Sequence, residues 1–269
     1  MKKKKFFTLP KILVTVYVLL ILIGVIVTLS LPPKPEPVEE ASATLANTET
    51  IVQTEAPTEK NAHYIEGVPV IQQYDLKAGC ETYACTMLLQ SLGFDIDEYR
   101  FADNYLIYKD VYYDNDFRMY GPDMHSAFAG NVYDIGYGVY APAMAKSMNN
   151  FLSSVKSPLK AYAMEGEPLE SLCETYIDND IPVMIWATTN MWEPTPHTSW
   201  TVDYVDENAT KKVGDTETWY EHEHCLVLIG YDEKEYFFAD SVAGVVSHFE
   251  KAEVEERYKQ IGTMSIVVK

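Results

Sequence analysis

A hydrophobic run lies close to the start of the chain. Residues 12–31 read ILVTVYVLLILIGVIVTLSL, twenty positions without a charged side chain. About twenty apolar residues in a helix are needed to cross the hydrocarbon layer of a membrane. The run is longer than the apolar part of a secretory signal, and Pro32, Pro33 and Lys34 follow it directly, which is a poor context for cleavage. The pattern therefore predicts a transmembrane signal-anchor helix over 12–31.

The flanks of this run predict its orientation. Lys2–Lys5 precede it, and basic residues mark the cytoplasmic side of a membrane segment. We therefore expect residues 1–11 to be a cytoplasmic tail and the rest of the chain to lie outside the cell. Residues 32–62 are rich in Pro, Glu, Thr, Ala and Ser, a composition that predicts a disordered stalk. The Ala-Ser-Ala run at Ala41–Ala43 leaves cleavage of the anchor as an alternative.

The hydrophobic pattern of residues 63–269 is that of one globular domain. Apolar residues at helical spacing predict a helix over Cys80–Leu92 that is closed by Gly93. Other runs predict an extended segment over 68–71, loops with short helices over 99–140, helices over 142–152, 168–179 and 254–260, a long loop with part of a hairpin over 191–213, and strands over 181–188, 224–231, 235–240 and 263–268. A front helix followed by several strands predicts an α+β fold, with that helix packed on an antiparallel sheet.

The charge of the chain excludes one class of partner. The sequence has 21 basic and 40 acidic residues, a net charge of −19, and five of the basic residues precede Pro32. Nucleic-acid binding needs clustered cations, so we predict no nucleic-acid partner, and contact with lipid only through the N-terminal helix. A hydrophobic content of 47% is sufficient for a buried core. The sequence does not indicate an oligomeric state.

Cys80 is the first candidate for chemistry. It follows Gly79 and begins the predicted helix. The positive end of a helix dipole lowers the pKa of a thiol and supplies thiolate, the attacking species. Glu81 would complement the same dipole, and Gly79 would let a substrate backbone approach. We therefore expect Cys80 to react well below the free-thiol pKa of about 8.5; the alternative is an ordinary cysteine at a helix start.

The other three cysteines have a simpler interpretation. Cys85, Cys173 and Cys225 lie in apolar stretches and are typical of small buried hydrophobic residues. Outside the cell an even number of cysteines also suggests disulfides. Cys80 and Cys85 lie on one predicted helix in a poor geometry for bonding to each other. A bridge between Cys85 and Cys173 is the leading alternative.

A thiolate needs a base, and His224 is the best candidate. It stands where the polar segment EHEH meets a buried strand. Asp240, at the end of the returning strand, is a candidate to orient the imidazole and support its charged form. The register of the hairpin is not readable from the sequence, and Asp232 and Glu235 are competing carboxylates that resemble solvated turn residues.

An oxyanion hole needs hydrogen-bond donors beside the nucleophile. The backbone N–H of Cys80 and the side-chain amide of Gln72 or Gln73 are the candidates, and chemistry alone does not choose between the two glutamines.

The rival site is metallic. His222 and His224 are two residues apart, so on a strand they would share a face. Zinc ligands to complete such a site would come from Glu221, Glu223, His197 or His248. The motif H-E-x-x-H is absent, and no third ligand stands at a compelling spacing. We therefore predict neither a metal nor a cofactor.

Two stretches together resemble a known family. The front stretch VPVIQQYDLKAGCETYACTMLLQSLGF and the rear stretch EHCLVLIGYDEKEYFFADS are similar to the bacterial cysteine peptidases of family 39, in their stand-alone, membrane-anchored or secreted 39-like group. The matching positions are Val68, Pro69, Gln73, Gly79, Cys80 and Glu81 in front, and His224, Gly230, Tyr231, Asp232 and Asp240 behind. The resemblance extends over about residues 67–268, and the usual Asp-Pro is Asp240-Ser241 here.

This resemblance implies a papain-like fold and a triad of Cys80, His224 and Asp240, with Gln73 as the oxyanion donor. The function it implies is a membrane-anchored extracellular thiol hydrolase of a Gram-positive-type cell. Such an enzyme would cleave a peptide or isopeptide amide of a peptide or protein substrate through a thioester. A transamidase with the same residues is one alternative. The other is an inactive binding or adhesion module with residues 99–140 as its contact surface.

The predicted orientation can be tested on intact cells or protoplasts. Protease added from outside should remove the globular part, because the basic residues 2–5 place the N-terminus in the cytoplasm. Immunodetection of the globular part before and after lysis measures this. Survival of that part until the cells are lysed would contradict the orientation.

Overall fold

The computed structural model describes residues 62–269. The predicted cytoplasmic tail, membrane segment and all but the last residue of the predicted stalk lie outside the described residues. Within 62–269, no helix is long and apolar enough to cross a membrane.

The helices are α2 (Cys80–Ser91), α3 (Glu98–Asn104), α4 (Ala141–Ser154), α5 (Leu169–Thr175) and α6 (Lys251–Ile261), with 3-10 turns at Ile177–Asn179 and Thr189–Met191. The strands are β1 (His63–Tyr64), β2 (Tyr108–Lys109), β3 (Tyr112–Tyr113), β4 (Met119–Pro122), β5 (Phe128–Ala129), β6 (Ala161–Glu165), β7 (Val183–Thr188), β8 (Thr195–Tyr204), β9 (Thr216–Glu221), β10 (Glu223–Tyr231), β11 (Glu235–Asp240), β12 (Val245–Glu250) and β13 (Met264–Val268).

A seven-stranded sheet forms the centre of the domain. Its order is β12-β11-β10-β7-β13-β6, and β1 pairs with β10. Every pairing in this sheet is antiparallel. The α+β fold with an antiparallel sheet, expected from the sequence, is confirmed.

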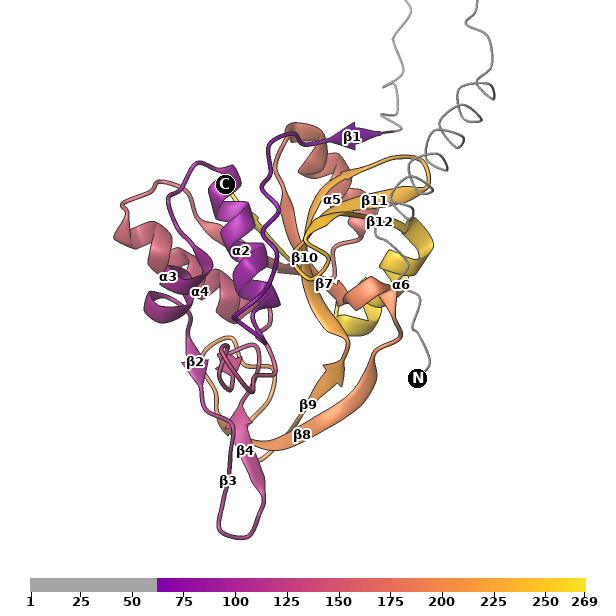
Figure 1. Cartoon of the computed structure of the whole chain (residues 1–269). Helices are drawn as coiled ribbons and strands as arrows, with labels where there is room; N and C mark the ends of the chain where they lie inside the picture. Colours follow the sequence, from indigo (N-terminus) through magenta and orange to yellow (C-terminus); the bar gives the residue numbers. More distant parts are fainter. Residues whose placement is uncertain (1–61) are drawn as a thin grey trace, which may run out of the picture. The chain divides into compact units, whose positions relative to one another are not determined.

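Helices cover both faces of this sheet (Figure 1). Side chains alternate along a strand, so Met184 and Trp186 of β7 pack in the core with α2 and α4, whereas Val183 and Ile185 pack in the core with α5 and α6. The central strand β10 is buried on both faces, and for this reason its sequence is a continuous apolar run instead of an alternating one.

Helix α2 begins at Cys80 and ends at Ser91, close to the predicted range. Gly79 precedes it, and no side chain caps the helix. A Cβ at Gly79 would lie 2.6 Å from the Cβ of Leu76, and Gly79 itself is buried. The lack of a side chain at Gly79 therefore lets the chain pack closely against its own Leu76.

The predicted elements differ from the structure mainly at short strands whose pairing partners are distant in sequence. Strands β6, β9 and β12 were not predicted, and residues 68–71 are not a strand. The segment predicted as a long loop with part of a hairpin contains the ten-residue strand β8, which pairs antiparallel with β9 and also pairs with β4 in a separate four-stranded sheet. Residues 99–140, predicted as loops with short helices, also contain the short strands β2, β3, β4 and β5. Many residues of β8 are exposed, so its hydrophobic pattern is weak and only pairing reveals it.

All four cysteines are free, and the bridge between Cys85 and Cys173 does not form. Cys85 belongs to the core on the α2 side of the sheet and Cys173 to the core on the α5 side. The sheet therefore separates the two sulfurs. Burial raises the pKa of Cys85 well above its ordinary value and that of Cys173 to about 12, so both are inert thiols.

The buried Trp186 provides a test of how the sheet supports the loop before α4. Its ring is fully buried, and its Nε1 donates to the carbonyl of Val139 over 2.9 Å. Trp186→Phe should lower the free energy of unfolding by about 1–3 kcal/mol, because it leaves a buried carbonyl without its donor. Urea unfolding measures this. Trp192→Phe is the matched control, since Trp192 is 54% exposed, and it should change stability by less than about 0.5 kcal/mol. Equal losses in the two variants would contradict the assignment.

Candidate active site

The ends of one helix and two strands carry the three candidate residues near one cleft. Cys80 is the first residue of α2, His224 is the second residue of β10, and Asp240 is the last residue of β11. Cys80 and His224 both line a cleft of about 430 Å³. The rest of its wall is formed by Gln73, Lys77, Ala78, Glu81, Asp134, Ile135, Gly136, Tyr137, Gly138, Thr189, Trp219, Glu223 and Val242.

The structure brings His224 and Asp240 together. The β10–β11 hairpin places the end of β11 beside the start of β10, and Nε2 of His224 lies 2.9 Å from Oδ1 of Asp240. Both side chains are buried, at 1% and 3% exposure. The competing carboxylates lie at the other end of the hairpin, where Asp232 accepts the backbone N–H groups of Lys234 and Glu235.

The carboxyl group of Asp240 is held as an anion. Its Oδ1 also accepts the backbone N–H groups of Val242 and Ala243, and its Oδ2 accepts the hydroxyl of Ser247. Burial alone would raise the pKa of Asp240, but the bond to His224, its charge and these further donors hold that pKa below its ordinary value. An ionised Asp240 can only accept, so the proton of this hydrogen bond is on Nε2 of His224, and Nδ1 is the ring nitrogen that Asp240 does not engage.

Gln73 lines the cleft and Gln72 is not part of its wall. However, Nε2 of Gln73 donates to the carbonyls of Leu76, over 2.8 Å, and Lys77, over 3.2 Å. The expected oxyanion donor is thus turned toward the chain's own carbonyls in this state. The N–H of Cys80 is at the first position of α2, where backbone N–H groups have no partner inside the helix.

Ser241, the residue directly after β11, forms hydrogen bonds with Gln73. The buried Ser241 carbonyl accepts the backbone N–H of Gln73 over 2.8 Å, and its hydroxyl donates to Oε1 of Gln73 over 3.4 Å. The departure from Asp-Pro in the sequence therefore adds a side-chain contact to Gln73.

Two glutamates lie against the sulfur of Cys80. The Cys80 thiol donates to Oε2 of Glu81 over 3.3 Å, and Oε1 of Glu81 accepts the backbone N–H of Val139 over 2.8 Å. Glu223, on β10, joins them: one ligand atom from each of Cys80, Glu81 and Glu223 lies within 4.8 Å of the other two. This cluster is not predicted by the sequence pattern. The available signal was that each glutamate is the sequence neighbour of a candidate catalytic residue.

The low pKa of Cys80 that its place at a helix start predicts is not found. Burial raises the pKa of this thiol well above its ordinary value, and the negative charges of Glu81 and Glu223 and the thiol of Cys225 raise it further. The backbone N–H of Cys225 opposes these effects only in part. Cys80 is therefore a neutral thiol in this state, and the positive end of α2 does not outweigh the burial and the carboxylates.

The zinc site considered from the sequence is not assembled. The ring of His222 packs against Trp192, with centroids 5.1 Å apart, and that of His197 packs against Trp219 at 5.4 Å. Among residues 62–269, the only three potential metal-ligating side chains that converge are the thiol and carboxylates described above, and none is a histidine.

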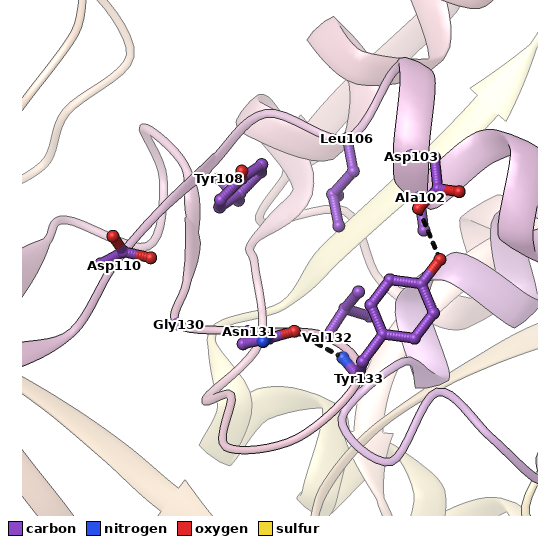
Figure 2. A pocket seen from close by; sticks show the side chains of 9 residues that line it. All are labelled: Ala102, Asp103, Leu106, Tyr108, Asp110, Gly130, Asn131, Val132 and Tyr133. Atoms are coloured by element: carbon purple, nitrogen blue, oxygen red, sulfur yellow. Dashed lines mark hydrogen bonds between the residues drawn. The ribbon is translucent and has the colours of Figure 1, made fainter.

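A second pocket, of about 320 Å³, lies by α3 and β2 (Figure 2). In its wall Tyr133 donates to Oδ1 of Asp103 over 2.6 Å, and burial together with this bond raises the pKa of Tyr133 to about 12. None of the residues predicted to carry chemistry lines this pocket, so we place the candidate chemistry in the cleft at Cys80.

Comparisons with known proteins point to one family. The model of the Peptidase_C39 like family matches residues 65–266. A crystal structure from Bacillus anthracis described as a C39-like peptidase is 26% identical, with a TM-score of 0.63, over 77% of this chain and 97% of that chain. The peptidase domain of Streptococcus ComA, a bi-functional ABC transporter, is 9% identical with a TM-score of 0.41, over 75% of this chain and 98% of its own. No curated protein matches the sequence.

The lowered pKa of Asp240 predicts how its contribution to stability depends on pH. A carboxyl group whose pKa is lower in the folded chain stabilises the fold above its unfolded pKa of about 3.9, and this is lost as the pH falls through the folded value. Asp240→Asn should therefore be less stable than the unchanged protein at pH ~7, and the gap should narrow below pH ~4. Urea unfolding at several pH values measures it. Asp95→Asn, at a fully exposed side chain, is the control that should show no gap. A gap that is constant with pH would contradict the prediction.

Proposed function

Because the chain belongs to the C39-like peptidase family, we propose that it is a cysteine peptidase that hydrolyses a peptide or isopeptide amide. The observation that carries this proposal is the buried hydrogen bond of 2.9 Å between His224 and Asp240, in a chain whose cleft is lined by both His224 and Cys80. The description of the B. anthracis protein as a C39-like peptidase supports the same class of reaction. The domain would be of the papain-like type.

The proposed reaction begins with proton transfer. Nδ1 of His224 takes the proton of the Cys80 thiol as the sulfur attacks the carbonyl carbon, and Asp240 stabilises the imidazolium that forms. The negative charge on the carbonyl oxygen is stabilised by the backbone N–H of Cys80 and by the amide of Gln73, which has to turn away from the carbonyls of Leu76 and Lys77.

The second half of the reaction returns the enzyme to its starting state. The imidazolium of His224 gives its proton to the leaving nitrogen, the C–N bond breaks, and a thioester to Cys80 remains. Water then attacks the thioester and loses a proton to His224. The C–S bond breaks, the proton returns to the sulfur, and the carboxylic acid leaves.

We also propose that this domain is presented outside the cell. The support is in the sequence alone: an uncharged apolar run over 12–31 that follows the basic Lys2–Lys5. The lipid bilayer would then be a partner through that run, and the substrate an extracellular peptide or protein.

Graded substitutions test the proposed roles. Cys80→Ala removes the bond-forming sulfur, so it should leave essentially no turnover. His224→Ala should be nearly as damaging, with a loss of about 10²–10⁴-fold from acid–base catalysis alone. Asp240→Asn keeps the shape but removes the charge that supports the imidazolium, so its loss should be smaller. Cleavage of a mixed peptide library, followed by mass spectrometry, measures all three.

The controls separate the alternatives. Asp95→Asn should leave cleavage unchanged, iodoacetamide should abolish it, and EDTA should not. A folded Asp240→Asn variant as inactive as Cys80→Ala would show that Asp240 does more than orient His224. Incorporation of an added amine into products would identify a transamidase. A folded protein that cleaves nothing and whose Cys80 does not react with a thiol probe would be a binding module.

A further inference from the structure

Glu81 and Glu223 approach each other from different elements. Glu81 is the second residue of α2 and is fully buried, and Glu223 is the first residue of β10. Their carboxyl groups and the sulfur of Cys80 form the cluster within 4.8 Å described above. Two carboxyl groups this close in a buried site do not both ionise readily, because each charge opposes the other.

The backbone at Gly138 makes room for both carboxyl groups. Gly138 has a φ of +93°, and a Cβ there would collide with Oε1 of Glu81 and lie 3.1 Å from Oε2 of Glu223. The chain therefore passes closely over the two carboxyl groups at the one position that lacks a side chain. The backbone at Gly138 thus packs directly against both carboxyl groups, which also form part of the wall of the cleft.

The hydrogen bonds of the two carboxyl groups are unequal. Glu81 accepts from the Val139 N–H and from the Cys80 thiol. Trp219 lowers the pKa of Glu223 only in part, and Oε1 of Glu223 is buried without a partner among the described residues. A buried carboxylate oxygen without a donor is unfavourable, whereas a protonated carboxyl group becomes a donor that a neighbouring carboxylate can accept.

The pKa values of Glu223 and Glu81 are both raised, which favours retention of a proton by the pair. Burial raises the pKa of Glu223 well above its ordinary value, and the charge of Glu81 raises it further. Burial also raises the pKa of Glu81, although hydrogen bonds from Val139 and Cys80 and the charge of His224 oppose this. The pair thus holds a proton at pH values where isolated glutamates have lost theirs.

Few other charges face the pair. The titratable or polar groups around it are Tyr140 before α4, Trp219 on β9, His224 and Cys225 on β10, and Lys77 and Asp134 on the wall of the cleft. Lys77 and Asp134 are exposed and form an ion pair with each other, at 3.5 Å. Among these groups, only a protonated His224 would offer a nearby positive charge from a buried position.

We propose that Glu81 and Glu223 form a proton-holding carboxyl pair that controls the ionisation of Cys80. While the pair keeps its proton, one negative charge faces the sulfur. When the pH rises and the proton leaves, a second charge appears beside Cys80 and holds it as a thiol, so thiolate forms only at higher pH. The two glutamates are positioning residues for the nucleophile, and their importance for catalysis rests on the proposed function.

The pH dependence of Cys80 alkylation tests this without any substrate. Iodoacetamide reacts with thiolate, and mass spectrometry of the peptide that contains Cys80 isolates its reaction from those of the other cysteines. Glu223→Gln prevents the second charge, so it should move the alkylation midpoint to lower pH by about one unit or more. Glu221→Gln, an exposed glutamate at the end of β9, is the matched control and should leave the midpoint unchanged. An unshifted midpoint in folded Glu223→Gln would overturn the proposal.

A measurement on the unchanged protein covers the case in which the variant does not fold. Because charge accumulates beside Cys80 as the pH rises, its alkylation should rise over a wider pH range than a single-proton curve, with a midpoint above about 8.5. A single-proton curve at or below that value would refute the carboxyl pair. If no peptide is cleaved but the alkylation midpoint shifts in Glu223→Gln, the carboxyl pair is supported and the peptidase proposal fails. If peptides are cleaved but the midpoint does not shift, the peptidase proposal is supported and the carboxyl pair fails.

Discussion

The structure depends on the burial of strand β10 between its neighbours β7 and β11. Apolar side chains leave this strand toward both faces of the sheet, so its register against both neighbours is strongly specified. That register sets where the polar residues at its start, Glu223 and His224, are placed. A slip by one residue would exchange the two faces and separate His224 from Asp240. The geometry of the cleft is therefore a consequence of hydrophobic packing several residues away from it.

The second constraint is electrostatic and acts on the thiol of Cys80. A helix N-terminus stabilises a nearby anion by about 0.3–1 kcal/mol, and by about 2 kcal/mol in a favourable, partly buried site. Removal from water opposes ionisation of a thiol, and this effect raises the pKa of the partly buried Cys80. The two carboxyl groups beside the sulfur of Cys80 oppose its ionisation further. Together these effects outweigh the stabilisation of the thiolate by the helix dipole. A position at the start of α2 therefore does not by itself supply thiolate.

Asp240 and Glu223, two acidic residues near His224 in the chain or in space, differ in how fully their carboxyl oxygens are hydrogen-bonded. Asp240 has four hydrogen-bond donors around its two oxygens, which is the environment of a permanent anion. Glu223 has one buried oxygen without a donor, which is the environment of a group that keeps a proton. The different surroundings of Asp240 and Glu223 thus favour different protonation states in two carboxyl groups, in the manner by which acid–base sites separate the roles of chemically similar groups.

Local signals in the sequence determined much of the fold and of the candidate site. The spacing after Cys80 predicted α2 to within one residue, and the apolar runs predicted β7, β10 and β11, because these patterns depend on neighbours along the chain. Tertiary structure alone decided what depends on partners distant in sequence. Those features are the pairing of the weakly patterned β8, the contact between His224 and Asp240, the separation of Cys85 from Cys173 by the sheet, and the meeting of Glu81 with Glu223 under Gly138. The charge state of Cys80 belongs to this second group, because burial and long-range contacts set it.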